Sequence, residues 1–185
     1  ESCRRAIAEA TADPGLAQTP ILLPAPVLQG GQRWRSDAGD WLTLEFRSAH
    51  SDSDLAWWNE RERLLVAPSL LYQDRLPELA QGSLRGWVAA LGELDRLQPE
   101  KLVGNRPSSR SGLAATLRYL CELERTVTQA LDSGQSATEA MRIELPAHRH
   151  LSGYAERHGF NLQRAWRELE PRWIQGLPPA CPDPD

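Results

Sequence analysis

The sequence predicts a mixed α/β (α+β) domain in which the strands come first along the chain and the helices last. Apolar and polar residues alternate over Trp41–Arg47, which is typical of a strand with one buried face. Apolar residues recur at helical spacing over residues 84–97 and again over residues 113–131. A chain of 185 residues is long enough to bury a substantial core. We therefore predict a single domain over residues 1–177, followed by a proline-rich, disordered tail over residues 178–185.

The N-terminal part combines a short helix with an extended segment. Residues 2–10 favour a helix, and the breaker run Asp13–Gly15 ends it. Residues 19–28 (TPILLPAPVL) are apolar but contain three prolines, so they suit an edge strand or irregular β structure. A turn at Gly30–Gly31 then leads into a short strand over residues 32–36.

The next part predicts antiparallel strands joined by short turns. Residues 37–40 read as a hairpin turn that leads into the strand at residues 41–47. A polar turn over residues 49–54 follows. Residues 55–59 and 64–67 are predicted to pair as strands around a charged turn.

The rest of the chain predicts helices separated by one more strand. After a loop over residues 68–82, Ser83 can cap a helix over residues 84–97. Residues 101–103 form a short strand that ends in a turn over residues 104–107.

Three helices are predicted after that turn. A long helix over residues 112–132 stops at Gly134, and residues 136–139 have the pattern of a capping box. A loop then leads to a last helix near residues 161–174.

The overall composition excludes two classes of partner. The net charge is -4 and the basic residues are scattered, which argues against a nucleic-acid partner. No apolar run approaches the roughly 20 residues that a membrane span needs. The chain contains seven tryptophans against two phenylalanines; ordinary core positions are favoured for them over a partner surface.

The three cysteines do not define a disulfide framework. Cys3, Cys121 and Cys181 are widely spaced and form no CxxC pair, which excludes a zinc ribbon. Because Cys121 lies among apolar residues of a helix, we expect it to be a buried thiol. Whether Cys3 and Cys181 form a bridge stays open. The chain begins at Glu1 without methionine, which is consistent with a removed signal peptide, a tag or a longer N-terminal region.

His50 is the main candidate metal ligand. It ends a predicted strand and precedes a Ser/Asp-rich turn, where a neutral imidazole can bind a metal. One histidine is not a site, because catalytic zinc needs about three protein ligands and an open position. On spacing alone, a hydrogen-bonded turn residue is the favoured interpretation.

Other polar groups are weaker candidates for metal or cation binding. His148 and His150, together with His158, have the look of a metal site, but a solvated loop is favoured. Asp52 and Asp54 could bind a cation, although hydrogen bonding to the turn backbone is the commoner role.

Several stretches in the correct order resemble metallo-β-lactamase-fold hydrolases. Residues 48–97 are similar to the family pattern AHTxGDLxVW…VLFAGDLVFxxRxP…WLxxLxxL. LVGNRP resembles VPGHGP, and ATLRYLCELERTV resembles TRxYLxxLxxxV. The ending HGFNLQRAWRELEP looks like the HxxNVxRAYxELE of the quinoprotein relay system zinc metallohydrolase subgroup, and CRRAIAEA…TPILLPAPVL is similar to that subgroup's linker. The resemblance covers nearly the whole chain and implies the C-terminal two-thirds of a metallo-β-lactamase-like αββα sandwich.

The resemblance also implies a damaged metal site. His50 stands at a zinc-ligand position, Ser69 where the metal-bridging Asp would be, and Asn105 where the His of PGHG would be. A hydroxyl and an amide are poor zinc ligands. The HxHxDH motif, which supplies most ligands in the family, is absent from these 185 residues and would precede Glu1. Zinc is thus possible only by resemblance, and we assign no catalytic or cofactor-binding residue.

The expected function is a degenerate, non-catalytic protein that acts as an interaction or accessory module of a quinoprotein (PQQ) dehydrogenase system. A periplasmic or secreted location is implied by the resemblance alone. Because the first strands of the sandwich are not in this sequence, part of the inner sheet face is expected to be uncovered and to bind a protein partner or a second copy. The alternative is a zinc-dependent hydrolase whose main ligands lie in upstream sequence; a purely structural domain of a larger protein is the third possibility.

Overall fold

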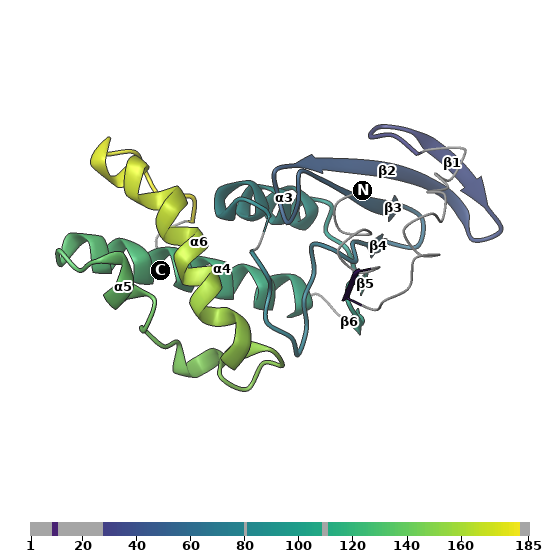
Figure 1. Ribbon diagram of the computed structural model, residues 1–185. Coiled ribbons are helices and arrows are strands. Elements are labelled where there is room, and N and C mark those ends of the chain that lie inside the picture. Colours follow the sequence, from purple (N-terminus) through teal and green to yellow (C-terminus); the bar gives the residue numbers. More distant parts are fainter. Residues whose placement is uncertain (1–8, 11–27, 80, 109–110, 182–185) are drawn as a thin grey trace.

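The structure is a computed structural model that describes residues 9–10, 28–79, 81–108 and 111–181. Figure 1 shows a sheet with α3 beside it and the remaining helices gathered at the opposite end of the molecule. Residues 9 and 10 are helical, while the rest of the predicted helix at 2–10 lies outside the described residues. The predicted extended segment at 19–28 also lies outside them, apart from Leu28.

One six-stranded sheet contains the strands in sequence order, β1-β2-β3-β4-β5-β6. Neighbouring strands are antiparallel except β4 and β5, which are parallel. The five predicted strands are therefore confirmed, while β6 begins at Pro107, the last residue of a segment that the sequence predicted as a turn. The six strands are β1 (Arg33–Ser36), β2 (Gly39–Arg47), β3 (Ser53–Asn59), β4 (Leu64–Val66), β5 (Lys101–Val103) and β6 (Pro107–Ser108).

The pairings set the direction of each strand. Since β3 is antiparallel to both β2 and β4, the strands β2 and β4 run the same way, and β5 runs parallel to β4. The C-terminal ends of β2, β4 and β5 therefore meet at one edge of the sheet, which we call the strand-end edge. His50, Ser69 and Asn105 each lie two or three residues beyond one of these ends.

Four α-helices and one 3₁₀ turn follow β4 in the described part of the chain. They are α3 (Leu84–Arg96), α4 (Ser111–Asp132), α5 (Ala137–Ala140), the 3₁₀ turn Pro146–His148 and α6 (Tyr154–Ile174). The Ser83 hydroxyl accepts from the Gly86 N–H, and Ser136 with Glu139 forms a capping box, as predicted. Within the described ranges, no helix has the length and apolar character needed to cross a membrane.

The predicted start of α6 is wrong by seven residues. The sequence indicated a helix from residue 161, but α6 begins at Tyr154, directly after Gly153 in the left-handed conformation (φ 82°). Tyr154 and His158 belong to the buried stripe of this helix, together with Asn161. These side chains carry polar groups, so the pattern of apolar residues did not indicate the first two turns of α6.

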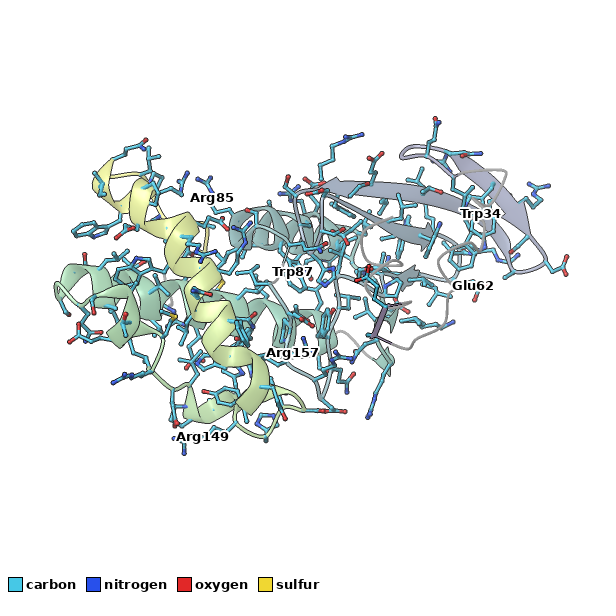
Figure 2. All side chains as sticks on the ribbon, in the orientation of Figure 1. Trp34, Glu62, Arg85, Trp87, Arg149 and Arg157 are labelled. Atoms are coloured by element: carbon cyan, nitrogen blue, oxygen red, sulfur yellow. A yellow bond between two sulfur atoms is a disulfide. The ribbon has the colours of Figure 1, made fainter. Side chains whose placement is uncertain are left out.

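The two faces of the sheet differ in what covers them. On one face, Phe46, Ala56, Trp58, Leu65 and Leu102 join the main core with buried residues of the helices. On the other face lie six side chains outside that core, which we call the tryptophan face: Trp34, Trp41, Thr43, Trp57, Val66 and Val103. Figure 2 places Trp34 at the β1 end of the sheet, far from the helices.

The C-terminal residues differ from the prediction. Cys121 is not a free thiol but forms a disulfide with Cys181, 60 residues away. The buried carboxylate of Glu124 accepts hydrogen bonds from the backbone N–H groups of Ala180 (2.7 Å) and Cys181 (2.8 Å). Residues 178–181, which we placed in a disordered tail, are thus held against α4 by a disulfide and by hydrogen bonds to the buried Glu124 side chain. Residues 182–185 and Cys3 lie outside the described part.

Candidate functional site

The strand-end edge is the candidate site, and α3 determines where His50 sits. A Cβ on Gly86 would lie 1.9 Å from the Ser48 carbonyl oxygen, so only glycine lets α3 approach the turn after β2 this closely. The Ser83 N–H donates to the Ala49 carbonyl at 2.9 Å, which fixes the same approach. As a result, the ring of Trp87 meets the ring of His50 edge-on, with centroids 5.2 Å apart. Figure 2 shows Trp87 in the middle of the molecule, between α3 and the sheet.

Both ring nitrogens of His50 face other side chains. Nδ1 lies 3.5 Å from Oδ1 of Asp54, and Nε2 lies 3.3 Å from the hydroxyl of Tyr72. Asp54 is buried and also accepts from the backbone N–H of Ser51 at 2.8 Å. Asp54 therefore has the backbone-bonding role that the sequence favoured, while Asp52 lies exposed in the same turn. The His50 side chain itself is 28% exposed.

Tyr72 is anchored from its other side by the helix α4. The Tyr72 N–H donates to the Thr116 hydroxyl at 2.9 Å, and that hydroxyl lies within hydrogen-bond distance of the carbonyls of Tyr72 and Gly112. Thr116 is fully buried. Burial raises the pKa of the Tyr72 phenol above its ordinary value, so Tyr72 stays protonated beside His50.

Asn105 makes the contacts that a neighbouring strand would make. Its Oδ1 accepts from the Gln73 N–H at 2.9 Å, and its Nδ2 donates to the Gln73 carbonyl at 3.0 Å. A Cβ on Gly104 would lie 2.4 Å from the Leu71 carbonyl oxygen, so this approach also requires glycine. The segment Leu71–Gln73 thus lies between two candidate positions: its middle residue contacts His50, and its ends contact residues 104–105.

Ser69 is partly buried after β4, and the described part of the chain shows no hydrogen bond from its hydroxyl. The topology brings Ser69, His50 and Asn105 to the same edge of the sheet. No hydrogen bond or ion pair joins any two of the three within the described residues.

These donors do not fit zinc. The edge offers one imidazole whose two nitrogens face Asp54 and Tyr72, one hydroxyl, and one amide that is used by the backbone of Gln73. Structural and catalytic zinc sites need about three or four imidazole, thiolate or carboxylate ligands. In the residues that the structure describes, no group of three or more His, Cys, Asp or Glu side chains could hold a metal ion.

The second histidine group is not the solvated loop that we expected. His148 is buried, and its Nε2 lies 2.8 Å from Oε2 of Glu122. His158 is buried on α6, whereas His150 is exposed. The sequence placed His148 and His158 in one loop because it missed the start of α6.

His158 belongs to a chain of hydrogen bonds with one consistent direction. Its Nε2 donates to the Ile143 carbonyl (3.1 Å), so its Nδ1 accepts from the Tyr119 hydroxyl (3.2 Å), which accepts from Asn161 (2.8 Å). Asn161 also accepts from the Leu79 N–H. Burial lowers the pKa of His158 and raises that of Tyr119, so both stay neutral. This cluster is structural.

Sequence reasoning missed the residues that surround His50. Tyr72, Trp87 and Thr116 lie 22 to 66 residues further along the chain, and neither spacing nor residue type links them to His50. Glu168 was missed as well: its carboxylate accepts from the Ser83 hydroxyl and from the Leu84 and Arg85 N–H groups, at the positively polarised start of α3.

Comparisons with known proteins identify the fold. No family model matches the chain, and no curated protein matches it. Among solved structures, a metallo-β-lactamase family protein from Thermus thermophilus is similar, with a TM-score of 0.60, 17% identity, and coverage of 95% of this chain and 60% of that one. The stereoselective inverting sec-alkylsulfatase Pisa1 from Pseudomonas sp. gives a TM-score of 0.57 and 14% identity, covering 76% of this chain and 26% of that one.

The predicted metallo-β-lactamase-like fold is therefore confirmed. The chain spans 60% of the length of the first of these structures and 26% of the second. At such identities the likeness concerns the fold alone.

Proposed function

We propose that this chain is a degenerate, non-catalytic protein of the metallo-β-lactamase fold that acts by binding another protein. The observation that carries the proposal is what the side chains at the strand-end edge contact. Three strand ends converge there, yet Asn105 is bonded to backbone, Ser69 offers only a hydroxyl, and the nitrogens of His50 face Asp54 and Tyr72. Of the three groups at these strand ends, the His50 ring and the Asn105 amide thus face protein partners, and Ser69 has no group that binds zinc well.

The partner that we propose belongs to a quinoprotein (PQQ) dehydrogenase system in the periplasm or outside the cell. The sequence resemblance to the quinoprotein relay subgroup supports this assignment. The Cys121–Cys181 disulfide adds independent support for an oxidising compartment, because such bonds are rare in reducing ones. We assign the contact to the tryptophan face, whose six side chains lie outside the main core.

A zinc-dependent hydrolase is the second candidate function. One observation favours it: His50 keeps an imidazole at a strand end, with 28% of its side chain exposed. Its remaining ligands would have to lie in sequence outside these 185 residues.

Zinc analysis of the purified full chain separates the two candidates. The proposal expects substoichiometric zinc in the wild type and in His50→Ala alike. Stoichiometric zinc that His50→Ala removes would overturn the non-catalytic assignment. The double variant Ser69→Asp/Asn105→His restores carboxylate and imidazole at the other two strand ends, and we expect it to bind zinc at least about tenfold more tightly than the wild type, or about 1.4 kcal/mol. No gain in the folded double variant would mean that the three positions do not converge on one point.

Genetic complementation tests the accessory role. We expect loss of the protein to lower PQQ-dependent dehydrogenase activity in the source organism. Because no metal is involved, His50→Ala should restore that activity as well as the wild type does. Trp57→Asp, which puts a charge on the tryptophan face, should not restore it. Failure of His50→Ala to complement, in a protein that is present and folded, would contradict the proposal.

A further inference from the structure

The outward side of α6 combines three arginines with one exposed aromatic ring. Arg157, Phe160, Arg164 and Arg167 are spaced by three or four residues, so their side chains leave the helix on one side. We call these four residues the arginine stripe. The buried side of α6 packs on α4, which α6 crosses in Figure 1. Because the Phe160 side chain is 71% exposed, the stripe belongs to the surface of the molecule.

The arginine stripe lines a hollow of about 350 Å³ beside α6. Of the seven described residues that line this hollow, six lie on α6, and Glu78 comes from the loop before α3. Phe160 is the one apolar side chain among the seven. Pockets for small molecules are mostly apolar and enclose most of the ligand, whereas protein interfaces are enriched in arginine and aromatic residues. The hollow therefore suits a segment of another protein better than a small molecule.

Arg157 has a carboxylate partner that it shares. It forms an ion pair with Glu78, and the other carboxylate oxygen of Glu78 lies 4.0 Å from Arg75. One carboxylate thus serves two guanidinium groups, so positive charge remains at this end of the stripe. The ion pair also fixes the position of the Arg157 side chain.

Arg164 and Arg167 carry charge that no described carboxylate balances. Arg164 donates to the Gly82 carbonyl from Nε (3.2 Å) and from Nη2 (2.8 Å), which holds its guanidinium group in place without neutralising it. Arg167 is exposed, and neither arginine forms an ion pair with a residue that the structure describes. The carboxylate of Glu168, the next residue, accepts from backbone N–H groups at the start of α3. The stripe is therefore positive in a chain of net charge -4.

Acidic residues stand at both ends of the stripe and limit its length. Glu156 precedes the stripe, Glu170 follows it, and both are exposed. From Arg157 to Arg167 the helix rises by about 15 Å. An extended segment of about five residues, at about 3.3 Å per residue, has the same length. A longer acidic segment would approach Glu156 or Glu170, where like charges repel.

We propose that the arginine stripe binds a short, extended acidic segment of a partner protein, about five residues long, that contains one aromatic or large aliphatic side chain. The carboxylates of this segment pair with Arg164 and Arg167, since a guanidinium group can bind a carboxylate through two hydrogen bonds. Its apolar side chain covers the ring of Phe160. Charge complementarity selects this occupant, because a second copy of the stripe would place arginines against arginines. The stripe is separate from the tryptophan face, so this contact goes beyond the proposed function.

A nucleic acid has the same sign of charge but fits the stripe less well. Its phosphates continue well beyond the stripe in both directions, where the exposed Glu156 and Glu170 repel them. Proteins that bind single strands stack successive bases on aromatic rings, and the stripe offers only Phe160. A nucleic acid is therefore the alternative that the experiment has to separate from an acidic peptide.

A nuclear magnetic resonance titration of the isotope-labelled full chain tests the proposal. The probe is the acetylated and amidated peptide Glu-Asp-Phe-Asp-Glu at low ionic strength. We expect the Nε–H resonances of Arg164 and Arg167 and the backbone resonance of Phe160 to shift together, with a Kd below about 1 mM. Added salt should reverse these shifts, because it screens the charges. Shifts that do not include these residues, or no saturable shift, would overturn the proposal.

Two comparison probes test the chemistry of the occupant. In the peptide Glu-Asp-Ser-Asp-Glu the aromatic side chain is lost at unchanged charge, and we expect its Kd to be about threefold higher or more. A five-nucleotide oligodeoxythymidine has a similar charge, and we expect it to bind at least about fivefold more weakly than the first peptide. Equal or tighter binding of either probe would contradict the proposed occupant.

Matched variants of the chain locate the contact. Arg167→Glu reverses a charge in the stripe, and we expect it to raise the Kd of the first peptide at least about tenfold. Arg125→Glu, on the exposed side of α4, is the control and should change the Kd less than about twofold. Equal effects of these two substitutions would mean that the peptide responds only to net charge, which would overturn the proposal.

A second pair of variants tests the aromatic ring. Phe160→Ser should raise the Kd of the first peptide about threefold or more. Ile174→Ser is the control, because Ile174 is also 71% exposed on α6 but lies about 21 Å further along the helix; it should leave the Kd unchanged. An unchanged Kd in a folded Phe160→Ser variant would contradict the role of the ring. None of these readouts involves zinc or complementation, so failure of this proposal and failure of the proposed function can be told apart.

Discussion

The strand-end edge and the tryptophan face belong to one sheet, yet their polar side chains are in opposite situations. At the edge, the amide of Asn105 and the ring nitrogens of His50 face protein partners. On the face, the indole N–H groups of Trp34 and Trp57 have no partner among the described residues. A buried polar group that lacks its partner costs about 1–3 kcal/mol. The difference indicates that the polar groups of His50 and Asn105 contribute to the stability of the fold, whereas the two indole N–H groups gain no hydrogen bond within the described residues.

The largest effect is expected at Thr116, which ties the edge to α4. Thr116→Val removes the acceptor of the Tyr72 N–H while keeping the shape of the side chain, so the buried N–H is left unpaired. We expect the free energy of unfolding in urea to fall by about 1–3 kcal/mol. Thr126→Val, on the same helix, is the control and should change it by less than about 0.5 kcal/mol. Equal effects of the two substitutions would mean that the edge is not held by this hydrogen bond.

A pH titration extends the comparison to the paired cluster in the helical half. Burial lowers the pKa of His158 in the folded chain, so below the unfolded value of about 6.5 the unfolded state binds more protons. Stability should therefore fall as the pH drops through 6.5 toward the folded pKa, and no further below it on account of this group. In His158→Gln, the free energy of unfolding should depend less on pH between the folded pKa of His158 and pH 6.5. The other titratable groups near His158 are Tyr119, Tyr154, His148 and Glu122.

One outcome of the pH titration would contradict this prediction. If stability rises as the pH falls from 6.5, protonated His158 is favoured in the fold, and the direction of hydrogen bonds that we assign to the cluster is wrong. His150→Gln is the matched control, because His150 is exposed and in the same region of the chain.

A smaller effect is expected at Asn105. Asn105→Ala removes the two hydrogen bonds to the Gln73 backbone, and since the position is exposed, water replaces them in part. We expect a loss of about 1 kcal/mol in the free energy of unfolding. Gln135→Ala, also exposed, should leave it unchanged. Unchanged stability in Asn105→Ala would contradict the structural role that we assign to the Asn105 amide.

The smallest effect is expected at Ser69. Its hydroxyl makes no hydrogen bond within the described part of the chain, so Ser69→Ala should change the free energy of unfolding by less than about 0.5 kcal/mol. A larger loss in the free energy of unfolding, measured under the same denaturant conditions, would mean that the Ser69 hydroxyl stabilises the fold as the Asn105 amide does.

Much of the fold could be predicted because the signals were local. The alternation in β2, the Ser83 cap and the Ser136–Glu139 capping box each involve neighbouring residues, and the structure contains all three. The start of α6 was missed because Tyr154 and His158 are buried through hydrogen bonds and ring contacts, which an apolar pattern does not register.

The site was predicted only in position. The sequence placed His50, Ser69 and Asn105 at strand ends, and the sheet does bring these ends to one edge. It could not predict what each side chain contacts, because Tyr72, Trp87 and Thr116 meet His50 only through the packing of α3 and α4. The Cys121–Cys181 bridge was missed for the same reason, since it joins residues that only the folded chain brings together.

The most direct test of the account is the response of the His50 ring to zinc. The two ring nitrogens of His50 can be followed by nitrogen resonances in a histidine-labelled full chain, with His50→Ala to assign them. We expect one equivalent of zinc to leave both resonances unchanged, because the two ring nitrogens already face Asp54 and Tyr72. A stoichiometric zinc-dependent shift of either His50 nitrogen would contradict it and would restore the strand-end edge as a metal site.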